Sequence, residues 1–455
     1  MTVAILEMAD NLADRLKDLS FEFTSNAAYL ASFFAVASLT RSARPEFEAG
    51  IHRRLLQDTL KWASVASPFY RDTLRDLLGA DGYIPASEFE SIPIIARDDI
   101  VRNVDAIRNP SADFAFATFT SGTTSGEPLI IDRCESEQEY LHDFLRALSL
   151  SSPSKKVYGL RLETPWHGRT LEFAPDYHSV SVSLSTMSGL KTAHALLRRK
   201  YVSGGQEFAI SAVGGGLVSL HRLTAYLERM ADRESLPRVE SLQSTSEYVT
   251  ARTRRRLEGF WGVDLIDRFG VSELIAGAWR CAKCRRYHFE PYGYPEVISF
   301  GSGKPISRGV GRLVLTGYYP FMQVVPLVRY STGDVVRLFE ADRCPTLRPG
   351  IELLGRVGRS AMRAGTWLIG ENELYDILDE YPFLQRNPFY QSFQGLEDAG
   401  AFPTFELKDD AGTMVLNVRR RQEASLTADD VTRFGDVVRS TLVERTGEKW
   451  RVELQ

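Results

Sequence analysis

The sequence predicts an α/β fold: a large N-terminal domain with twisted sheets and a β-rich subdomain, followed by a small α+β C-terminal domain. The length of 455 residues exceeds what one simple hydrophobic core organises, so two or three domains are expected. Strand-like and helix-like segments alternate in the middle of the chain with glycine turns between them, which is typical of α/β domains. Near the C-terminus, a helix, two strands and another helix follow one another as a separate small unit.

The large domain is expected to begin with helices and to end with strands. Over 44–78, apolar residues recur at steps of three and four with charged residues between them, which is the period of a helix. From residue 115 onward, we expect strands at 156–163, 209–215 and 263–270 and helices at 217–232 and 250–262. Turns rich in glycine and proline then separate further predicted strands at 294–300, 311–318, 325–330 and 334–340.

The C-terminal unit has its own pattern. The predicted elements are a helix at 370–382, strands at 402–409 and 413–420, and a helix that begins after the capping sequence 426–430. The segment LLGRVGRS (353–360) separates this unit from the preceding strands. We therefore divide the chain into an N-terminal domain, 1–354, and a C-terminal domain, 355–455.

Composition and charge argue against several classes of function. Lysine and arginine number 55 and aspartate and glutamate 59, and the net charge of −4 argues against a broad nucleic-acid or membrane-surface contact. The longest apolar run, 29–39, is shorter than the roughly 18 residues that a membrane span needs, and it is predicted to be a buried helix. The N-terminus does not resemble a secretory signal, so a cytoplasmic protein is expected.

One short segment concentrates hydroxyl groups and glycines between two strand-like runs. It comprises Thr120, Ser121, Gly122, Thr123, Thr124, Ser125 and Gly126. Glycine lets a backbone approach a ligand closely, and hydroxyls and free amides bind phosphate oxygens, so the segment suits a triphosphate. It is not a P-loop, because no Lys-Ser or Lys-Thr pair closes it. The alternative is a polar turn of a β-hairpin.

The cysteines are too few for a disulfide scaffold, but their spacing is informative. Cys281, Cys284 and His288 form a C-x2-C-x3-H pattern, in which two thiolates and an imidazole can hold one tetrahedral ion. Cys344 is the natural fourth ligand if the intervening strands fold back, which gives a zinc knuckle within 281–344. Such a Cys3His site is structural, because no position is left for water. The alternative is a pair of reduced surface thiols.

Four segments, in order along the chain, resemble one family. TSGTTSGEP (120–128) is similar to the phosphate loop of the acyl-adenylate-forming superfamily, and within it to that of the phenylacetate–CoA ligase family. DRFGVSEL (267–274), VRYSTGDVVRL (328–338) and LLGRVGRS (353–360) resemble the family's aromatic-Gly-x-Ser/Thr-Glu turn, its Tyr-x-Thr-Gly-Asp segment and its Gly-Arg hinge. The resemblance extends from residue 115 to the C-terminus, and the cysteine pattern is similar to one that relatives often carry.

The resemblance implies that this chain binds ATP. An adenine ring needs a flat partner, which Phe269 can supply, and Ser246 and Glu247 would border the same purine. The neighbouring residues assigned to the same nucleotide site are Arg268, Gly270 and Ser272. The alternative for Phe269, taken singly, is a place in the core.

Three charged residues are expected at the phosphates and the ribose. Glu273 follows a predicted strand and is a suitable ligand for Mg²⁺ that bridges phosphates. The carboxylate of Asp334 can accept hydrogen bonds from two ribose hydroxyls, and Arg356 offers donors to the ribose or a phosphate. The alternatives are a helix cap for Glu273 and a turn residue for Asp334.

Two further residues are candidates for catalysis beside Glu273. His167, in ETPWHGRTLEF (163–173), lies where the resemblance places the carboxylate pocket or the thiol tunnel, although an ordinary loop histidine fits equally well. Lys449 is the best match to a lysine that the family carries near the C-terminus, where it reaches the α-phosphate and the attacking carboxylate. The alternative is a solvated lysine in a polar tail.

The resemblance implies ATP-dependent activation of a carboxylic acid, with an aryl acid favoured, to an acyl-adenylate, and then transfer to coenzyme A as a thioester. An amine or a carrier-protein thiol is the alternative acceptor, and relatives are often dimers, so a homodimer is compatible with the family. Three departures from the family pattern, at Glu127, at Arg359 and in the STSE segment 244–247, keep open a different class: a zinc-stabilised binding protein that has lost the reaction.

Overall fold

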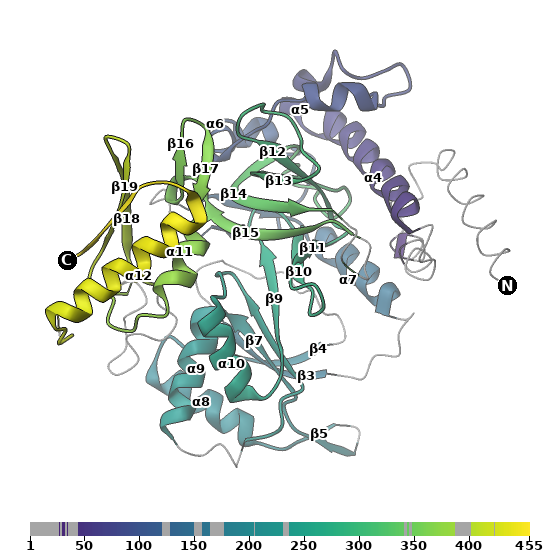
Figure 1. Ribbon diagram of the computed structural model, residues 1–455. Helices are drawn as coiled ribbons and strands as arrows, with labels where there is room; N and C mark the ends of the chain where they lie inside the picture. The colour runs from purple at the N-terminus through teal and green to yellow at the C-terminus, as the bar shows by residue number, and fades with distance from the viewer. Residues whose placement is uncertain are drawn as a thin grey trace, which may run out of the picture.

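The computed structural model describes residues 27, 30, 31, 34, 44–120, 128–149, 157–163, 177–203, 205–230, 236–340, 344, 348–386, 402–422 and 424–455. One extended sheet with helices beside it forms the large part of the molecule, and a smaller C-terminal part lies to one side (Figure 1). The predicted fold class is confirmed: the chain is mixed α/β with a large twisted sheet and a small C-terminal β domain. None of the helices in these ranges is long and apolar enough to cross a membrane.

The main sheet has the strand order β12-β13-β14-β15-β11-β10-β9-β8-β7-β3-β4. Its half from β9 to β4 is parallel, and its half from β9 to β12 is antiparallel, so β9 joins the two. The bounds are β3 Val157–Glu163, β4 Tyr177–Ser183, β7 Ala212–Gly216, β8 Ser241–Thr245, β9 Leu265–Gly270, β10 Gly277–Arg280, β11 Tyr287–Phe289, β12 Gly293–Ser299, β13 Gly309–Gly317, β14 Tyr330–Phe339 and β15 Gly350–Arg356.

Three helices lie together beside the parallel half of the sheet (Figure 1): α8 (Met187–Arg198), α9 (Leu217–Arg229) and α10 (Ala251–Trp261). Local sequence explains the bounds of α10. The Thr250 hydroxyl accepts the Thr253 amide at the N-terminus, and Gly262, with φ 73°, ends the helix in the left-handed region that glycine adopts without strain. This half of the molecule has its own apolar core, built from residues such as Leu220 and Leu242.

The N-terminal helices pack against the antiparallel half. They are α4 (Arg44–Ala66), α5 (Pro68–Leu74), the 3-10 helix η1 (Ala86–Ser91), α6 (Arg97–Ile107) and α7 (Glu135–Ser149). Buried Leu60, Tyr70 and Phe144 share one core with Phe321 from the segment after β13. Between α6 and α7 the strands β1 (Phe116–Phe119) and β2 (Ile130–Arg133) form an antiparallel pair, so the predicted phosphate loop connects two paired strands.

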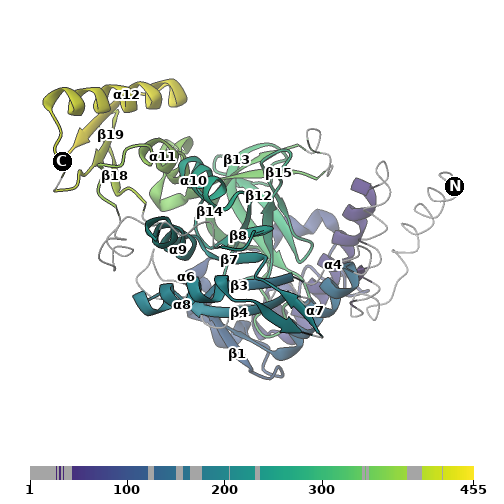
Figure 2. The same ribbon diagram turned by 90° about the horizontal axis from the view of Figure 1, so that it is seen from below.

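The C-terminal part has a hydrophobic core of its own. Its elements are β16 (Ala361–Arg363), β17 (Thr366–Ile369), α11 (Glu371–Leu378), β18 (Phe405–Asp410), β19 (Thr413–Val418), α12 (Ala428–Thr446) and β20 (Trp450–Leu454). Leu374, Leu416, Phe434 and Val438 are buried in this core. Seen from below, α12 and the β18–β19 pair project from one side of the large sheet (Figure 2). A separate core fits a domain division between residues 354 and 355, which stays a prediction.

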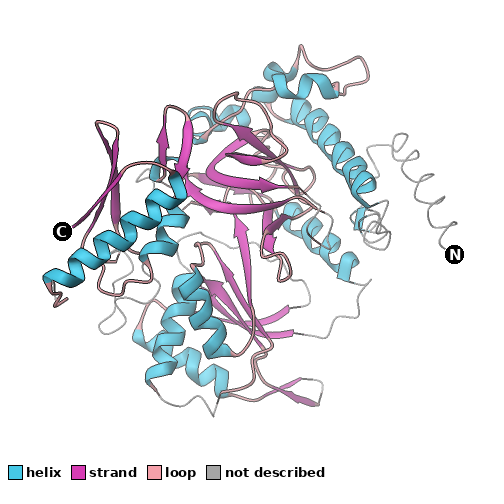
Figure 3. Cartoon of the chain, in the orientation of Figure 1, coloured by secondary structure: helices cyan, strands magenta, loops and turns pink. Residues whose placement is uncertain are grey.

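Most predicted helices and strands are present (Figure 3), and one predicted strand is wrong. Residues 325–329 are irregular, and the strand begins only at Tyr330. Arg329 adopts φ 50°, outside the extended region, and the Val328 amide donates to the Tyr70 hydroxyl rather than to a neighbouring strand. The strand β20, which pairs in parallel with β19, was not predicted from the sequence.

Candidate functional site

The STSE segment and the RFG turn lie side by side. Strands β8 and β9 pair in parallel, with Thr245 opposite Arg268, so the residues after each strand leave the same edge of the sheet. In open α/β sheets this edge, at the carboxyl ends of the strands, is where ligands bind. Ser246 adopts φ 83°, a conformation that costs energy for a residue with a side chain and is frequent at binding sites.

Glu247 holds the N-terminus of α9. Its Oε2 accepts the Leu217 amide at 2.8 Å, which satisfies a helix amide that has no partner inside the helix. Burial raises the pKa of Glu247 to about 7, and the backbone amides of Leu217 and Val218 oppose this rise. The carboxylate is therefore engaged with α9, and a role for Glu247 at a purine edge stays a prediction.

The predicted adenine partner, Phe269, lies near the end of β9 and packs partly buried against the large core. Its neighbour Arg268 is engaged inside the protein: its Nε and one terminal nitrogen donate to the two carboxylate oxygens of Glu290 at 2.8 and 2.6 Å. The same guanidinium donates to the Ile275 carbonyl at 3.1 Å. The bond to Ile275 connects the two sides of the turn between β9 and β10, in which Ser272 lies, and Gly270 is the last residue of β9.

Glu273, the predicted Mg²⁺ ligand, lies in that turn and is held from two sides. The Tyr330 hydroxyl donates to its Oε1 at 2.7 Å, and Arg133 donates to its backbone carbonyl at 2.8 Å. Both partners are buried. In the part of the chain that the structure describes, no side chain or amide donates to Oε2 of Glu273, so this oxygen is available to a cation.

Asp334 and Arg356, the predicted ribose residues, form an ion pair. Arg356 Nε lies 3.1 Å from Asp334 Oδ1, and a terminal nitrogen of Arg356 donates to the Thr332 carbonyl at 2.6 Å. Asp334 Oδ2 is buried and accepts no hydrogen bond from any described residue. Burial raises the pKa of Asp334, and Arg356 opposes that rise. A buried carboxylate oxygen without a donor is costly, which fits a ligand hydroxyl as its partner.

Glu273 and Asp334 belong to one electrostatic cluster. The nearby carboxylate of Asp334 raises the pKa of Arg356 most, and Glu273 raises it further. The phosphate loop begins next to the same cluster, because the Thr118 hydroxyl donates to the Ser272 carbonyl at 3.0 Å. Thr120 continues the β1–β2 pairing, since its hydroxyl accepts the Leu129 amide at 2.9 Å.

Some predicted site residues lie outside the described residues. They are Ser121, Gly122, Thr123, Thr124, Ser125 and Gly126 of the loop, and His167. Lys449 is described: it is exposed, just before β20, and its carbonyl accepts the Met414 amide at 2.9 Å. Its neighbour Glu448 pairs with Arg363 of β16. Among described residues, none forms a hydrogen bond or ion pair with the Lys449 ammonium, and its catalytic role stays a prediction.

Sequence reasoning missed Glu371, which organises the predicted hinge. Its carboxylate accepts the Arg356 amide at 3.2 Å and the Tyr375 hydroxyl at 2.8 Å. Arg359, at one of the departures from the family pattern, pairs with the same carboxylate at 3.0 Å. The turn η4 (Val357–Arg359) is thereby folded against the start of α11. The sequence offered one indication of this role: Glu371 is an acidic residue in the first turn of a predicted helix, two residues after the segment Trp-Leu-Ile.

The C-terminal part contacts the large part at the first turn of α10. Asp376 of α11 accepts the Ala251 amide at 2.8 Å and the Tyr248 hydroxyl at 2.7 Å. The Ala251 amide is among the first of α10, which have no partner inside the helix, so a carboxylate is favoured there by the hydrogen bond and by the helix dipole.

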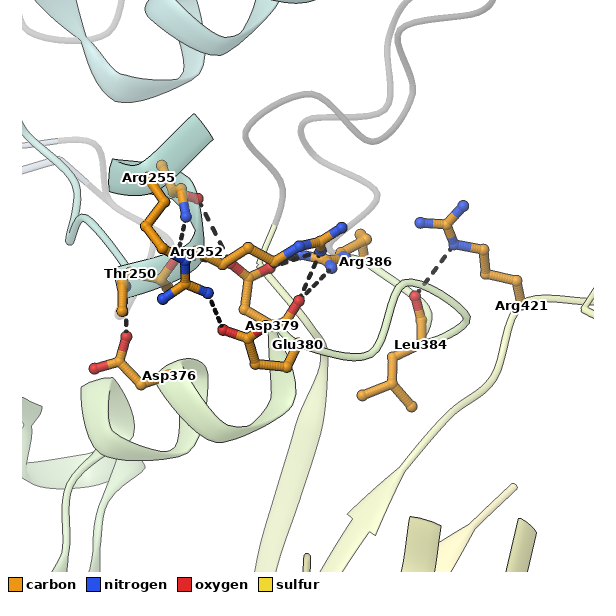
Figure 4. A network of polar contacts seen from close by, with 11 residues as sticks. Thr250, Arg252, Arg255, Asp376, Asp379, Glu380, Leu384, Arg386 and Arg421 are labelled. Carbon is orange, nitrogen blue, oxygen red and sulfur yellow. Dashed lines mark hydrogen bonds and ion pairs between the residues drawn. The ribbon is translucent and has the colours of Figure 1, made fainter. Parts of the chain in front are cut away.

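Asp379 and Glu380 extend this contact (Figure 4). The Thr250 hydroxyl donates to the Asp379 carboxylate at 2.6 Å, and Arg252 donates to the Asp379 carbonyl at 2.7 Å. Arg255 pairs with Glu380 at 2.6 Å, and Arg386 pairs with the buried Asp379 carboxylate. Acidic groups at the end of α11 thus face a basic helix N-terminus, and these contacts hold the C-terminal part in the orientation seen here.

The four predicted metal ligands lie together. One ligand atom from each of Cys281, Cys284, His288 and Cys344 lies within 4.8 Å of the other three. The sulfurs of Cys281 and Cys344 are 3.8 Å apart, and the Cys284 sulfur lies 3.1 Å from His288 Nε2. Tetrahedral Zn²⁺ with Zn–S bonds of about 2.3 Å separates its sulfur ligands by about 3.8 Å. The donor set and its spacing therefore fit Zn²⁺.

The surroundings of His288 also fit a metal centre. Its Nδ1 lies 3.0 Å from the Pro349 carbonyl, which can only accept, so the proton is on Nδ1 and the Nε2 lone pair faces the thiols. Without a cation, burial raises the pKa of Cys284 to about 11, and the thiols of Cys344 and Cys281 contribute to the rise. A coordinated cation reverses this, because a metal-bound thiol is deprotonated.

Comparisons with known proteins show what this fold is similar to. No protein-family model matches the chain, and no curated protein matches its sequence. The chain is similar to 2-hydroxyisobutyryl-CoA ligase in the postadenylation state, in complex with 2-HIB-AMP, with a TM-score of 0.62, 14% identity, and coverage of 90% of this chain and 86% of that one. For an open conformation of that ligase in complex with 2-HIB-AMP and CoA, the TM-score is 0.60 and the sequence identity 15%, with coverage of 90% of this chain and 88% of that one. For the same ligase in the thioesterification state, the TM-score is 0.54 and the sequence identity 14%, with coverage of 90% of this chain and 86% of that one. At these identities the similarity shows the fold.

Proposed function

We propose that this protein activates a carboxylic acid with ATP as an acyl-adenylate and then transfers the acyl group to the thiol of coenzyme A. The observation that carries this proposal is the cluster of Glu273, Asp334 and Arg356. The turn between β9 and β10 and the strands β14 and β15 bring these residues together next to the start of the phosphate loop. The cluster has one carboxylate oxygen available to a cation, on Glu273, and one buried carboxylate oxygen without a donor among the described residues, on Asp334. The fold shared with a CoA ligase that holds an acyl-AMP supports the same chemistry.

In the first step of this proposal, a carboxylate oxygen of the acid attacks the α-phosphorus of ATP. The bond from that phosphorus to the bridging oxygen breaks, and pyrophosphate leaves. Asp334 Oδ2 would accept the ribose hydroxyls while Arg356 orients Asp334 from its other oxygen. Glu273 Oε2 would hold Mg²⁺, which neutralises charge on the phosphates.

In the second step, the thiolate attacks the acyl carbon, the bond from that carbon to the phosphate oxygen breaks, and AMP leaves. One site serves both steps if the C-terminal part rotates between them about the turn 357–360. Lys449 would approach the α-phosphate in the orientation for the first step, where its ammonium stabilises the charge on the phosphoryl oxygens. The motifs favour the phenylacetate–CoA ligase branch, an aryl acid, and a structural zinc ion in the cysteine knuckle.

Pyrophosphate release tests the first step. Purified, zinc-replete protein is assayed with ATP, Mg²⁺ and a panel of aryl and aliphatic acids, and acid-dependent pyrophosphate is expected. Asp334→Ala is expected to reduce kcat/KM for ATP at least 10-fold, because a buried acceptor for a hydroxyl is lost. Asp436→Ala, which removes an exposed carboxylate that pairs with Arg439 on the same helix, is the control. Adding coenzyme A, then amines, identifies the acceptor. ATP binding without turnover across the whole panel would indicate a binding protein and contradict the proposal.

A further inference from the structure

Tyr330 is a buried residue whose contact with Glu273 has no part in the mechanism above. It is 2% exposed, and its hydroxyl donates to Glu273 Oε1 at 2.7 Å. Its backbone is fixed as well, because Ile95 forms a parallel bridge with it and the Ser331 amide donates to the Ile95 carbonyl at 2.8 Å. The fixed Tyr330 hydroxyl therefore binds a carboxylate oxygen that belongs to the turn between β9 and β10.

The turn that carries Glu273 is held in two further places. The hydroxyl of Thr118 binds the carbonyl of Ser272, and Arg133 binds the carbonyl of Glu273 itself. Arg133 is completely buried and pairs with Glu137, whose carboxylate accepts the Val324 amide at 2.9 Å. The backbone of the turn is thus fixed without Tyr330, and the Tyr330 hydroxyl has one remaining effect: it sets the orientation of the Glu273 carboxylate.

We propose that Tyr330 is a positioning residue that engages Oε1 of Glu273 and so presents Oε2 alone to the divalent cation of the ATP complex. This inference rests on the proposed function, because it takes Glu273 as the ligand of that cation. A carboxylate free to rotate binds a cation through either oxygen or both, whereas one fixed oxygen sets a single direction for the metal. The Tyr330 hydroxyl is the donor in this contact, because an ionised carboxylate oxygen can only accept.

Tyr330→Phe tests the inference, because it removes the hydroxyl and keeps the ring that fills the core. Groups that orient metal ligands typically contribute 10- to 100-fold to metal affinity. We therefore expect Mn²⁺ affinity in the presence of ATP, measured by electron paramagnetic resonance without any acid, to fall about 10-fold. The half-saturating Mg²⁺ concentration for pyrophosphate release is expected to rise by the same factor, while kcat at saturating Mg²⁺ stays within about twofold.

Tyr70→Phe is the matched control. Tyr70 is 1% exposed, and its hydroxyl accepts the Val328 amide at 2.9 Å, two residues before Tyr330. This variant loosens the same segment without touching Glu273, so its Mn²⁺ affinity is expected to equal that of the wild type. Equal Mn²⁺ affinity in Tyr330→Phe and Tyr70→Phe overturns the inference. Absence of pyrophosphate release from the wild type overturns the proposed reaction instead, and the Mn²⁺ titration still decides whether Tyr330 positions Glu273.

Discussion

Replacing Tyr248 by phenylalanine is expected to weaken the contact between the C-terminal part and α10. The Tyr248 hydroxyl donates to Asp376 at 2.7 Å, and the variant keeps the ring while removing this bond. A hydrogen bond to a charged group contributes about 1.5–3 kcal/mol when buried, and the half-buried position of Tyr248 reduces this to about 1–2 kcal/mol. The equilibrium between the docked and undocked C-terminal part then shifts by a factor of about 5–30.

Hydrogen exchange at the Ala251 amide measures this shift directly. The amide donates to Asp376 at 2.8 Å and has no partner inside α10, so it exchanges when α11 moves away. Its protection is expected to fall by the same factor of about 5–30 in Tyr248→Phe, while amides in β14 keep theirs. Tyr201→Phe is the control, because it removes a hydroxyl that donates to the Leu196 carbonyl far from this contact.

Two results would refute the reasoning. Unchanged protection of Ala251 in Tyr248→Phe would show that this hydrogen bond does not hold the C-terminal part in place. An equal loss of protection at Ala251 and throughout β14 would show that the variant destabilises the whole protein, and the structural assignment of the contact would then be wrong.

Three further predictions concern Glu247, the metal centre and Lys449. Folding raises the pKa of Glu247 from 4.5 to about 7. Between these pH values the folded protein keeps a proton on Glu247 that the unfolded protein has lost, so the free energy of unfolding decreases as the pH rises from 4.5 to about 7. Between pH 5 and 8, the free energy of unfolding of Glu247→Gln, measured with denaturant, is expected to increase by about 3 kcal/mol relative to that of the wild type. A constant difference in the free energy of unfolding between the two proteins over this pH range would contradict the prediction. Mass spectrometry of the purified protein under native conditions is expected to find about one zinc ion per chain, and Cys284→Ser is expected to lower both the zinc content and the Tm. Cys134→Ser, outside the cluster, is expected to keep the zinc content. Lys449→Ala is expected to slow acid-dependent pyrophosphate release about 100-fold and to leave the affinity for ATP nearly unchanged, because the ammonium of Lys449 acts on charge that develops during the reaction. A rate within twofold of the wild-type rate would show that Lys449 has no part in the mechanism.

Residues that are close in sequence could be predicted well. The helix α10 follows from apolar spacing between a threonine cap and Gly262, and the spacing of Cys281, Cys284 and His288 indicated a metal knuckle. Residues 325–329 could not be predicted, because their extended-looking pattern is overridden by Tyr70, which lies more than 250 residues earlier and takes the Val328 amide.

The sequence by itself determined the alternation of strands and helices, the glycine- and hydroxyl-rich loop, and the residue types at the candidate site, since each depends on neighbours along the chain. Only the tertiary structure decided what the charged groups contact. Arg133 and Glu273 are 140 positions apart, and Tyr330 and Glu273 are 57 apart. The sequence showed a carboxylate at residue 273, but its direction depends on side chains that the fold brings to it, because a hydrogen bond requires proximity in space and not in the chain.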